Sequence, residues 1–374
     1  MCRYDGGSFV HFNYEEALKV LTLYDHSGPK YHRCLLPLLM MPGIELTVAP
    51  RLTNELLADC DILFVNRMIA QPENMSIEEM INGWRKEYGF KLIVDNDDHW
   101  DLGRDHYMSS DYKRFGVSKT IVDFMRVADA VTVTHERLAE EAKEFNSNVH
   151  VLPNAIPDYD QFKCKKQEDD LVRLFWAGSI THLKDIELLK RPLQLIKRDK
   201  AKLVMGGFAR HPDWVRMAKI FTCDSSYNTE VIQAMQVERY YYMYSKCDIA
   251  LIPLLDTKFN RFKSNLKILE AAHIGSPVIV SRVHPYLDFP EELVNYVSGN
   301  DTWFKQINKL LKDHELVKEQ GKALKAYCES NFDFNLINLK RKKIFDEVSK
   351  QGSIGEVPND VHEPERVGEL SGDS

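Results

Sequence analysis

The chain has 374 residues, a formal net charge of −7 and 44% hydrophobic residues. This length suits two domains of ordinary size, and the hydrophobic content can supply a core for each. No stretch approaches the ~18–20 uninterrupted apolar residues of a membrane span, and the N-terminal MCRYDGGSFVHFNYEE lacks the basic-then-apolar order of a signal peptide. The seven cysteines are scattered and never form CxxC, which argues against a disulfide framework and a zinc site. We therefore expect a cytoplasmic protein without a membrane span.

The negative charge is unevenly placed. Residues 351–374 hold six acidic residues against one arginine, so they carry −5 of the −7 and leave −2 for the rest of the chain. A segment this polar has little to bury and is typical of disorder. We expect a disordered acidic tail, and the remaining charge argues only weakly against a polyanionic partner.

Short β-rich runs followed by helical patterns recur along the chain, and this alternation is typical of parallel βα units. We predict strands in residues 20–25, 44–50, 61–66, 91–98, 130–135 and 149–154, and then in 171–178, 201–207, 248–254, 277–281 and 294–298. The charged segment between these two sets, residues 157–170, has the composition of an interdomain linker.

The pattern predicts an α/β protein of two Rossmann-like domains whose parallel sheets face a cleft. We place the domains at residues 1–160 and 170–333, followed by a helix at 334–350 and the tail. Because ligands of open parallel sheets bind beyond the carboxyl ends of the strands, the functional residues should lie there.

The stretch FNRFKSNLKILEAAHIGSPVIVS, residues 259–281, changes from helical to strand-like spacing. Leu266, Leu269 and His273 fall on one side of a helix, and Gly275 suits the left-handed position that ends it. The sequence therefore predicts a helix running into a buried strand.

Lys263, Lys267 and Glu270 share another stripe of this predicted helix. Two cations and a carboxylate projecting together could hold a charged, hydroxylated ligand. They could also form a solvated face with a Lys267–Glu270 pair worth roughly 0.2–0.5 kcal/mol. The spacing alone leaves both interpretations open.

The predicted strand LVRLFWAG is followed by SITHLKD. Gly178 permits close backbone approach, and Ser179 or Thr181 can cap the next helix, whose N–H groups could receive a diphosphate. His182 and Lys184 would lie in the first turn and could complete an anion site. A capped turn with no ligand is the alternative.

Several segments, in this order and spacing, resemble the sugar-nucleotide glycosyltransferases of the GT-B fold, of the large retaining "glycosyl transferases group 1" type in its phage and bacterial subset. The segments are ADAVTVTHERLAEEA with VHVLPNAIP, WAGSITHLKD, CDIALIPL, and FNRFKSNLKILEAAHIGSPVIVS with HPY at 284–286. They cover roughly residues 125 to 290. The resemblance implies an N-terminal acceptor domain, a C-terminal nucleotide-sugar domain and a C-terminal helix that crosses back to the first domain.

The most specific segment is EAAHIGSPV, in which the resemblance implies that Glu270 holds the ribose hydroxyls of the donor. Lys263, Ser264 and Lys267 would lie towards the diphosphate and sugar, and the implied donor set also includes Gly178, His182 and Lys184. Many relatives carry a further Glu eight positions before the ribose Glu, and this chain has Phe262 there.

In the first half, YDHSGPKYHRCLLPLL resembles a loop and helix of phage and bacterial members. This likeness implies that His26, Ser27, Gly28 and Arg33 face the cleft.

The segment VDNDDHWD is the richest cluster of ionisable groups in the first half. Asp95-Asn96-Asp97 matches the DxD pattern that holds a divalent metal in a different glycosyltransferase fold, but two nucleotide-type domains argue against that fold. Asp97, Asp98 and His99 are our candidate catalytic residues, which could orient an acceptor hydroxyl or act as a base. A hydrated loop that caps a helix is the alternative.

We predict a retaining glycosyltransferase that moves a hexose or pentose from a nucleoside-diphosphate sugar to a hydroxyl acceptor, with no obligatory cofactor and no metal. The acceptor is expected to be a saccharide, with a hydroxymethylated base of phage DNA as the alternative, in which case the protein acts in the host cytoplasm. A sugar-nucleotide epimerase and a non-catalytic binding protein are the rival classes. A DNA acceptor would need a basic first-domain face, for which the candidates are Lys30, His32, Arg33, Arg67, Arg85, Lys86, Arg104, Lys113 and Arg114.

Overall fold

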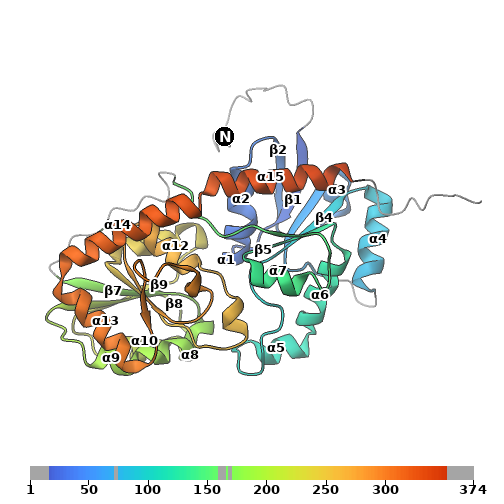
Figure 1. The fold of residues 1–374 in the computed structure, drawn as a ribbon. Coiled ribbons are helices and arrows are strands. Elements are labelled where there is room, and N and C mark those ends of the chain that lie inside the picture. Colours follow the sequence, from blue (N-terminus) through green and yellow to red (C-terminus); the bar gives the residue numbers. More distant parts are fainter. Residues whose placement is uncertain (1–16, 71–74, 159–165, 167–170, 352–374) are drawn as a thin grey trace, which may run out of the picture.

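The computed structural model describes residues 17–70, 75–158, 166 and 171–351. Two α/β domains lie side by side, and the last helix runs from the second domain across the first (Figure 1). The predicted disorder of the acidic tail concerns residues that lie almost entirely outside this description. Within the described ranges, no helix is long and apolar enough to cross a membrane.

The first sheet has six parallel strands in the order β2-β1-β3-β4-β5-β6. They are β1 Leu18–Leu23, β2 Ile44–Ala49, β3 Ile62–Asn66, β4 Lys91–Asn96, β5 Ala130–Val133 and β6 Val149–Val151. The surrounding helices are α1 Gly28–Lys30, the π-helical η1 Tyr31–Leu35, α2 Leu36–Leu39, α3 Asn54–Ala58, α4 Ile77–Tyr88, α5 Ser109–Arg114, α6 Val117–Val127 and α7 Glu136–Ala142.

The second sheet also has six parallel strands, in the order β12-β11-β10-β7-β8-β9. They are β7 Val172–Ala177, β8 Ala201–Phe208, β9 Thr229–Gln233, β10 Ile249–Ile252, β11 Val278–Ser281 and β12 Asn295–Val297. The helices are η3 Ile180–His182, α8 Leu183–Ile186, η4 Glu187–Leu189, α9 Lys190–Gln194, α10 Pro212–Thr222, α11 Val237–Tyr240, η5 Tyr241–Lys246, η6 Phe259–Phe262, α12 Leu266–His273, η7 Tyr286–Asp288, α13 Asn300–Lys312, α14 His314–Asn331 and α15 Phe334–Lys350.

The predicted α/β class with two parallel sheets is confirmed, and each predicted strand overlaps an observed one. Strand β9 was missed. It is the edge strand next to β8 and its residues are half-buried or exposed, so it lacks the apolar run that marks a central strand.

Each sheet reverses its strand order once, between β1 and β3 and between β7 and β10. The loops at the carboxyl ends of these strands diverge there, which leaves a crevice for a ligand. The topology therefore places a binding crevice in each domain.

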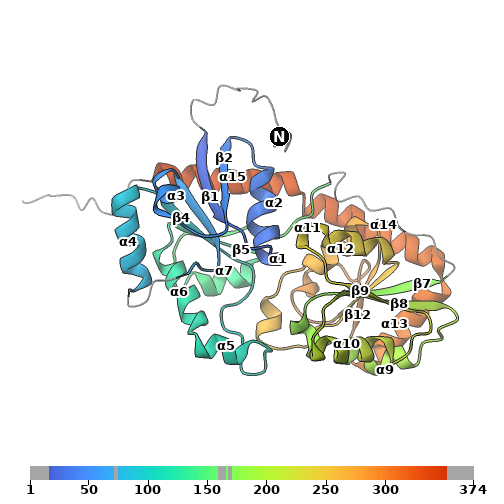
Figure 2. The same cartoon turned by 180° about the vertical axis from the view of Figure 1, so that it is seen from behind.

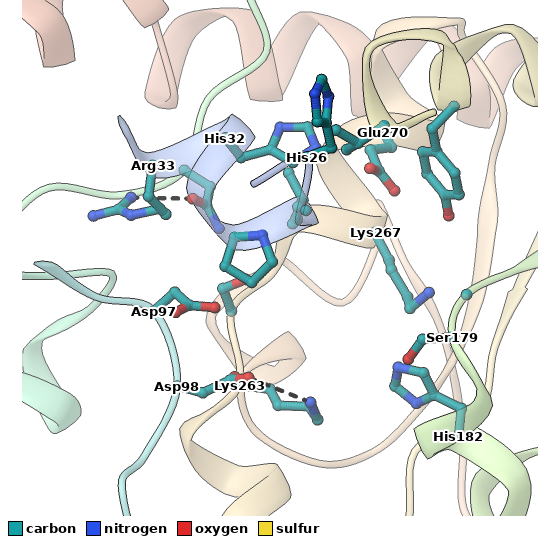
Figure 3. Close-up of a pocket in the computed structure, with 18 of the residues that line it drawn as sticks. His26, His32, Arg33, Asp97, Asp98, Ser179, His182, Lys263, Lys267 and Glu270 are labelled. Carbon is teal, nitrogen blue, oxygen red and sulfur yellow. Dashed lines mark hydrogen bonds and ion pairs between the residues drawn. The ribbon is translucent and has the colours of Figure 1, made fainter. Parts of the chain in front are cut away.

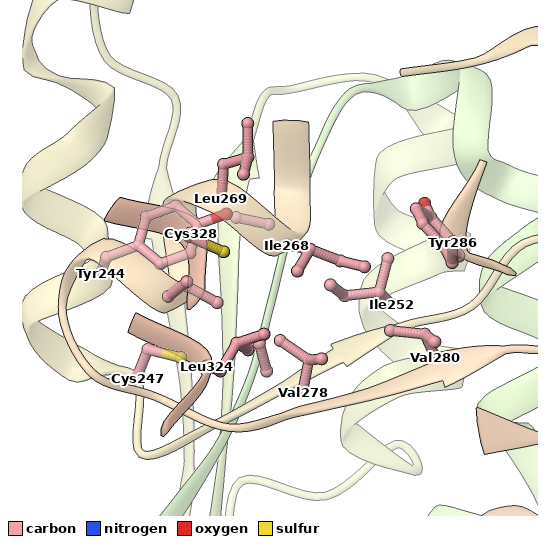
Figure 4. Packing of buried hydrophobic residues seen from close by; sticks show 14 of the residues in the cluster. Tyr244, Cys247, Ile252, Ile268, Leu269, Val278, Val280, Tyr286, Leu324 and Cys328 are labelled. Atoms are coloured by element: carbon pink, nitrogen blue, oxygen red, sulfur yellow. The ribbon is translucent and has the colours of Figure 1, made fainter. Parts of the chain in front are cut away.

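Helix α12 is held in place by burial on most of its surface. Ile268 and Leu269 pack with Val278, Val280 and Leu324 from β11 and α14 (Figure 4). At the end of the helix, Gly275 has the predicted left-handed conformation, with a φ of +68°. Helix α14 packs closely against this turn, because a Cβ added to Gly321 of α14 would lie only 2.1 Å from the Gly275 carbonyl oxygen. This packing fixes the direction in which the charged side chains of α12 emerge.

The two domains exchange apolar groups. Tyr31 and Leu36 of the first half belong to the core cluster of the second domain, where α1 and α2 face α11 and α12 (Figure 2). Phe262 of the second half belongs to the core cluster of the first. Helix α15 packs on the first sheet, with the Phe345 ring 5.1 Å from that of Phe64. Each domain therefore contributes apolar side chains to the core cluster of the other.

Candidate active site

A cavity of about 460 Å³ lies between the two domains. Its walls are formed by loops and helices that follow the carboxyl ends of strands in both sheets (Figure 3). The predicted residues that line it are His26, Gly28, Arg33, Asp97, Asp98, Gly178, His182, Lys263, Ser264, Lys267 and Glu270. Ser27, His99 and Lys184 are not among the lining residues.

On the second-domain wall, Glu270 is only 3% exposed. Its Oε2 accepts a hydrogen bond of 2.6 Å from the Tyr244 hydroxyl. Burial raises the pKa of Glu270 to about 6, although the nearby Lys267 charge and the Tyr244 hydrogen bond oppose the rise. Glu270 is therefore an acceptor held in a fixed position at the cavity.

Lys267 lies one turn earlier on α12. Its Nζ donates a 2.5 Å hydrogen bond to the carbonyl oxygen of Ala177 and lies 5.7 Å from the centre of the Trp176 ring. Burial lowers the pKa of Lys267 to about 8, while the Glu270 charge opposes this shift. Lys267 and Glu270 therefore lie in the cavity wall, which contradicts the alternative that they form a solvated pair on the surface.

Gly178 allows this arrangement. A Cβ on Gly178 would lie 2.9 Å from the Trp176 ring and 3.0 Å from Lys267 Nζ. The loop thus has no room for a side chain on the side of the lysine, in agreement with the close approach that the sequence indicated.

The turn after Gly178 differs from the predicted cap. The Ser179 and Thr181 hydroxyls lie 2.6 Å from each other, and η3 has no side-chain cap. His182 lines the cavity, and its Nδ1 lies 2.8 Å from Asp185 Oδ2. Burial lowers the pKa of His182, so the ring is a neutral polar group in the wall rather than a cation.

Lys184 lies elsewhere. Its Nζ donates to the backbone oxygen of Asp105 in the first domain at 2.8 Å, and its side chain is 59% exposed. It therefore connects the two domains outside the cavity, because the short helix α8 turns it towards the loop that precedes α5.

On the first-domain wall, Asp97 is bound by Arg67. Arg67 donates from Nε to Asp97 Oδ1 and from Nη2 to Oδ2, both at 2.8 Å. Burial would raise the pKa of Asp97, but the charge and hydrogen bonds of Arg67 outweigh burial and lower it. Asp97 is thus a fixed carboxylate whose two oxygens are both occupied, and it is poorly suited to act as a base.

Asp98 is held less tightly. Its Oδ2 accepts a 3.1 Å hydrogen bond from Arg67 Nη2 and lies 3.7 Å from Lys263 Nζ of the second domain. Oδ1 takes part in neither contact. Asp98 is therefore the better placed of the two aspartates to meet a hydroxyl group in the cavity.

His99 faces away from the cavity. It is 3% exposed, its ring stacks on Trp100 with centroids 4.6 Å apart, and its Nε2 lies 2.6 Å from Glu141 Oε2. The chain bends at Asp97 and Asp98 after the end of β4, and the His99 ring that follows is buried in the protein. The geometry gives His99 a packing role in place of the catalytic one that we expected.

The DxD triplet is not arranged around one point. Asp95 is buried, and its carboxylate accepts hydrogen bonds from Arg33, Asn66 and Thr132. Asp97 is bound to Arg67. Among the residues described, no group of three or more His, Cys, Asp or Glu could hold a metal ion.

Arg33 borders the cavity but is turned inward. Besides Asp95 its guanidinium donates to the Leu152 carbonyl oxygen at 2.7 Å and to Asn154 Oδ1 at 3.0 Å. Its exposed fraction is 1%. Arg33 therefore supports the wall from behind.

His26 reaches across the domain boundary. Its Nδ1 lies 2.9 Å from Glu238 Oε1, which also accepts a hydrogen bond from the Tyr24 hydroxyl. Ser27 is occupied locally, since its N–H donates to Asp25 Oδ1 at 3.1 Å. Of the predicted loop, His26 and Gly28 thus contribute to the cavity.

Sequence reasoning did not connect Arg67 with Asp97 or Tyr244 with Glu270, the contacts that hold these two carboxylates in place. Arg67 directly follows β3, so the rule that polar residues at strand ends face the ligand could have found it. It has a left-handed φ of +61°, which is uncommon for a residue with a side chain. Tyr244 belongs to the aromatic run before β10 and could not have been separated from packing residues by spacing.

Comparison with known proteins gives a match to the family model Glycosyl transferases group 1 over residues 172–313. The first half lies outside this match, including the part of our resemblance that precedes residue 172. No curated protein matches the sequence.

Solved structures match most of the chain. Sucrose-phosphate synthase from Thermosynechococcus elongatus has a TM-score of 0.63 and 16% identity, covering 88% of this chain and 99% of its own. Anabaena HepE in complex with UDP and glucose has a TM-score of 0.63 and 12% identity, with the same coverage. An alpha-glucosyltransferase in complex with UDP and a 13-mer DNA containing a HMU base has a TM-score of 0.61 and 14% identity, covering 88% and 100%. At these identities the likeness concerns the fold.

The two facing Rossmann-like domains and the family match together define a glycosyltransferase of GT-B architecture. The match to the Glycosyl transferases group 1 model covers residues 172–313, which include all the strands of the second sheet. This confirms the family and the enzyme class that the sequence motifs indicated.

Proposed function

We propose that the protein transfers a sugar from a nucleoside-diphosphate sugar to a hydroxyl group of an acceptor bound in the interdomain cavity. The observation that carries the proposal is the convergence of Glu270, Lys267 and Gly178 on one wall of this cavity, opposite Asp98. A buried carboxylate can accept hydrogen bonds from hydroxyl groups, and a desolvated lysine beside a glycine loop can bind phosphates. The three residues together therefore suit a ligand that carries both kinds of group.

In the proposed donor complex, Glu270 accepts hydrogen bonds from the ribose hydroxyls. Lys267 and Lys263 lie towards the diphosphate, and Ser264 and His182 offer polar contacts beside it. UDP is bound in the structures of HepE and of the alpha-glucosyltransferase, so UDP-sugars are the first donors to test.

In the proposed reaction, the bond between the anomeric carbon and the diphosphate oxygen breaks while the acceptor oxygen bonds to that carbon from the same face. The proton of the acceptor hydroxyl passes to the departing diphosphate oxygen. The lysines stabilise the charge that develops on the departing diphosphate. Asp98 accepts a hydrogen bond from the acceptor hydroxyl and orients it. We propose that the anomeric configuration is retained, as the resemblance of the sequence motifs implies, and the coupling constant of the product's anomeric proton in NMR would test this.

We propose a saccharide acceptor. Much of the basic face that duplex DNA would need is occupied: Lys30, Arg33, Arg67 and Arg85 are each paired with an aspartate. Arg104, Lys113 and Arg114 are exposed around α5. The likeness in fold to a glucosyltransferase crystallised with DNA keeps a hydroxymethylated base as the second candidate.

The test is a panel of UDP-, ADP- and GDP-sugars, each incubated with and without saccharide acceptors and a hydroxymethyluracil duplex. A transferase releases nucleotide faster with its acceptor, and mass spectrometry identifies the sugar-modified product. A sugar-modified nucleoside would overturn the saccharide proposal. Conversion of the donor sugar without acceptor, or binding without turnover, would overturn the transferase mechanism proposed for this site.

A further inference from the structure

Phe262 anchors a loop of the second domain in the first domain. It ends η6, which lies between β10 and α12, yet it is 7% exposed and belongs to the core cluster of the first sheet. Its ring lies 4.6 Å from that of His99, and its backbone oxygen lies 3.0 Å from His135 Nε2. The insertion of an apolar ring into the opposite domain fixes the position of the residue that follows.

That residue is Lys263, which lies between the carboxylate of Asp98 and the wall where the diphosphate is proposed to bind. Its Nζ is 3.7 Å from Asp98 Oδ2 and 4.8 Å from the centre of the Phe259 ring. It also lines the cavity together with Lys267, on the wall where the diphosphate is proposed to bind. Lys263 is thus within reach of both a first-domain carboxylate and the donor.

We infer that Lys263 exchanges partners during the catalytic cycle, leaving Asp98 for the diphosphate when the nucleotide binds. This exchange removes Lys263 from Oδ2 of Asp98, so the carboxylate that is proposed to orient the acceptor hydroxyl responds to the bound donor. The inference rests on the proposed function, because it requires a nucleoside diphosphate in the cavity.

Two features of the geometry favour the exchange. At 3.7 Å the Lys263–Asp98 contact is longer than the about 2.7–2.9 Å of a charge-assisted hydrogen bond, so little is lost when it opens. Asp98 keeps the 3.1 Å hydrogen bond from Arg67, so the carboxylate still has a charged hydrogen-bond donor after Lys263 leaves. A diphosphate carries more charge than one carboxylate and attracts the lysine more strongly.

Asp97 cannot substitute for Asp98 in this exchange. Both of its oxygens are bound by Arg67, and Asn66 Nδ2 donates to Oδ1 at 3.2 Å. Its contacts stay within the first domain. The carboxylate that responds to nucleotide binding is therefore Asp98 alone of this pair.

The test is a double-mutant cycle on the full chain, with the affinity for UDP, ADP and GDP measured by calorimetry. Asp98→Asn removes the competitor for Lys263, so it should tighten binding of the preferred nucleotide by about two- to fivefold. Lys263→Met should weaken binding. In the Lys263→Met background, Asp98→Asn should no longer tighten it, since the lysine that it would release is absent.

A matched control separates the exchange from a general change in charge. Asp105→Asn removes one negative charge from the same segment, where the side chain is 93% exposed, and should leave nucleotide affinity unchanged. Circular dichroism checks that each variant is folded, and Asp98→Ser serves as a second variant if Asp98→Asn is not.

The outcomes distinguish the two proposals. If the unaltered protein binds none of the nucleotides, the proposed function fails and the exchange fails with it. If it binds one and Asp98→Asn weakens binding, leaves it unchanged, or tightens it equally with and without Lys263, the exchange alone is overturned. A purely structural role for Asp98 would give weaker binding and cannot account for tighter binding.

Discussion

The two walls of the cavity handle charge in different ways. On the second-domain wall, burial moves the pKa of Glu270 up to about 6 and that of Lys267 down to about 8, so both groups are shifted towards neutrality. On the first-domain wall, Arg67 binds Asp97 through two hydrogen bonds and lowers its pKa, which holds both groups charged.

This difference indicates what each wall is built to receive. A desolvated cation gains from a ligand that brings opposite charge, which suits a diphosphate at Lys267. A wall whose ions already compensate one another gains little from a charged ligand, and it offers hydrogen bonds to a neutral, hydroxylated acceptor. The predictions below test this comparison from the largest expected effect to the smallest.

The largest effect is expected for the buried ion pair between Arg33 and Asp95, which lies behind the first-domain wall. Asp95→Ala leaves the guanidinium of Arg33 buried without its carboxylate, which should lower the free energy of unfolding by about 3–5 kcal/mol. Urea denaturation followed by circular dichroism measures the change. Glu291→Gln, which removes a carboxylate from a surface pair with Arg282, should leave the midpoint nearly unchanged. Equal midpoints for both variants would show that the buried pair does not support the wall.

On the second wall, Glu270→Ala should weaken nucleotide affinity at least about tenfold, because hydrogen bonds to a charged group contribute about 1.5–3 kcal/mol each. Calorimetry with the preferred nucleotide measures it. The control is Glu187→Ala, which removes a carboxylate of the same domain that pairs with Arg216 outside the cavity. Unchanged affinity and turnover in a folded Glu270→Ala protein would refute the ribose assignment.

The lowered pKa of Lys267 predicts a pH dependence of nucleotide binding. Its charged neighbours are Glu270, Lys263 and Asp185. Below pH 8 the lysine is a cation and attracts the diphosphate, and as pH rises through about 8 it loses its proton in the free protein. The diphosphate stabilises the cation and raises its pKa in the complex, so affinity should be highest below pH 8 and fall above it.

Calorimetry between pH 7 and pH 10 tests this, because a terminal phosphate with a pKa of roughly 6 is already ionised over that range. Lys267→Met should bind more weakly and show a smaller decline above pH 8. A decline of the same size in both proteins would assign the dependence to another group.

The smallest effect is expected for Lys184, which the sequence placed in the donor site and the structure places on the backbone oxygen of Asp105. Lys184→Ala should change nucleotide affinity by less than about twofold, since exposed contacts of this kind contribute little. Direct comparison with Lys267→Met by calorimetry measures it. A loss comparable to that of Lys267→Met would place Lys184 back in the donor site.

Sequence reasoning predicted most of the fold because parallel βα units repeat local patterns. Central strands such as β7 and β11 are mostly apolar and fully buried, and Gly275 marks the end of α12. Strand β9 lies at the edge of its sheet with exposed residues, and its assignment depends on pairing with β8, which no local pattern encodes.

The same distinction applies to the site. The residues of α12 and of the loop after β7 were expected in one donor site because their motifs resemble those of a known family, whereas local spacing alone left both interpretations open. In VDNDDHWD, spacing could not determine that Asp97 is bound by Arg67, that Asp98 faces the second domain and that His99 is turned into the core.

The sequence by itself determined the α/β class, two parallel sheets and the stretch that carries Lys263, Lys267 and Glu270, because these depend on periodicity and on residues that begin and end elements. Only the tertiary structure decided which charges are compensated. The insertion of Phe262 into the first domain brings Lys263 to Asp98, and the burial of α12 shifts the pKa values of Lys267 and Glu270. Ion pairs and desolvation depend on distances between residues far apart in the chain, and those distances exist only after both domains have packed together.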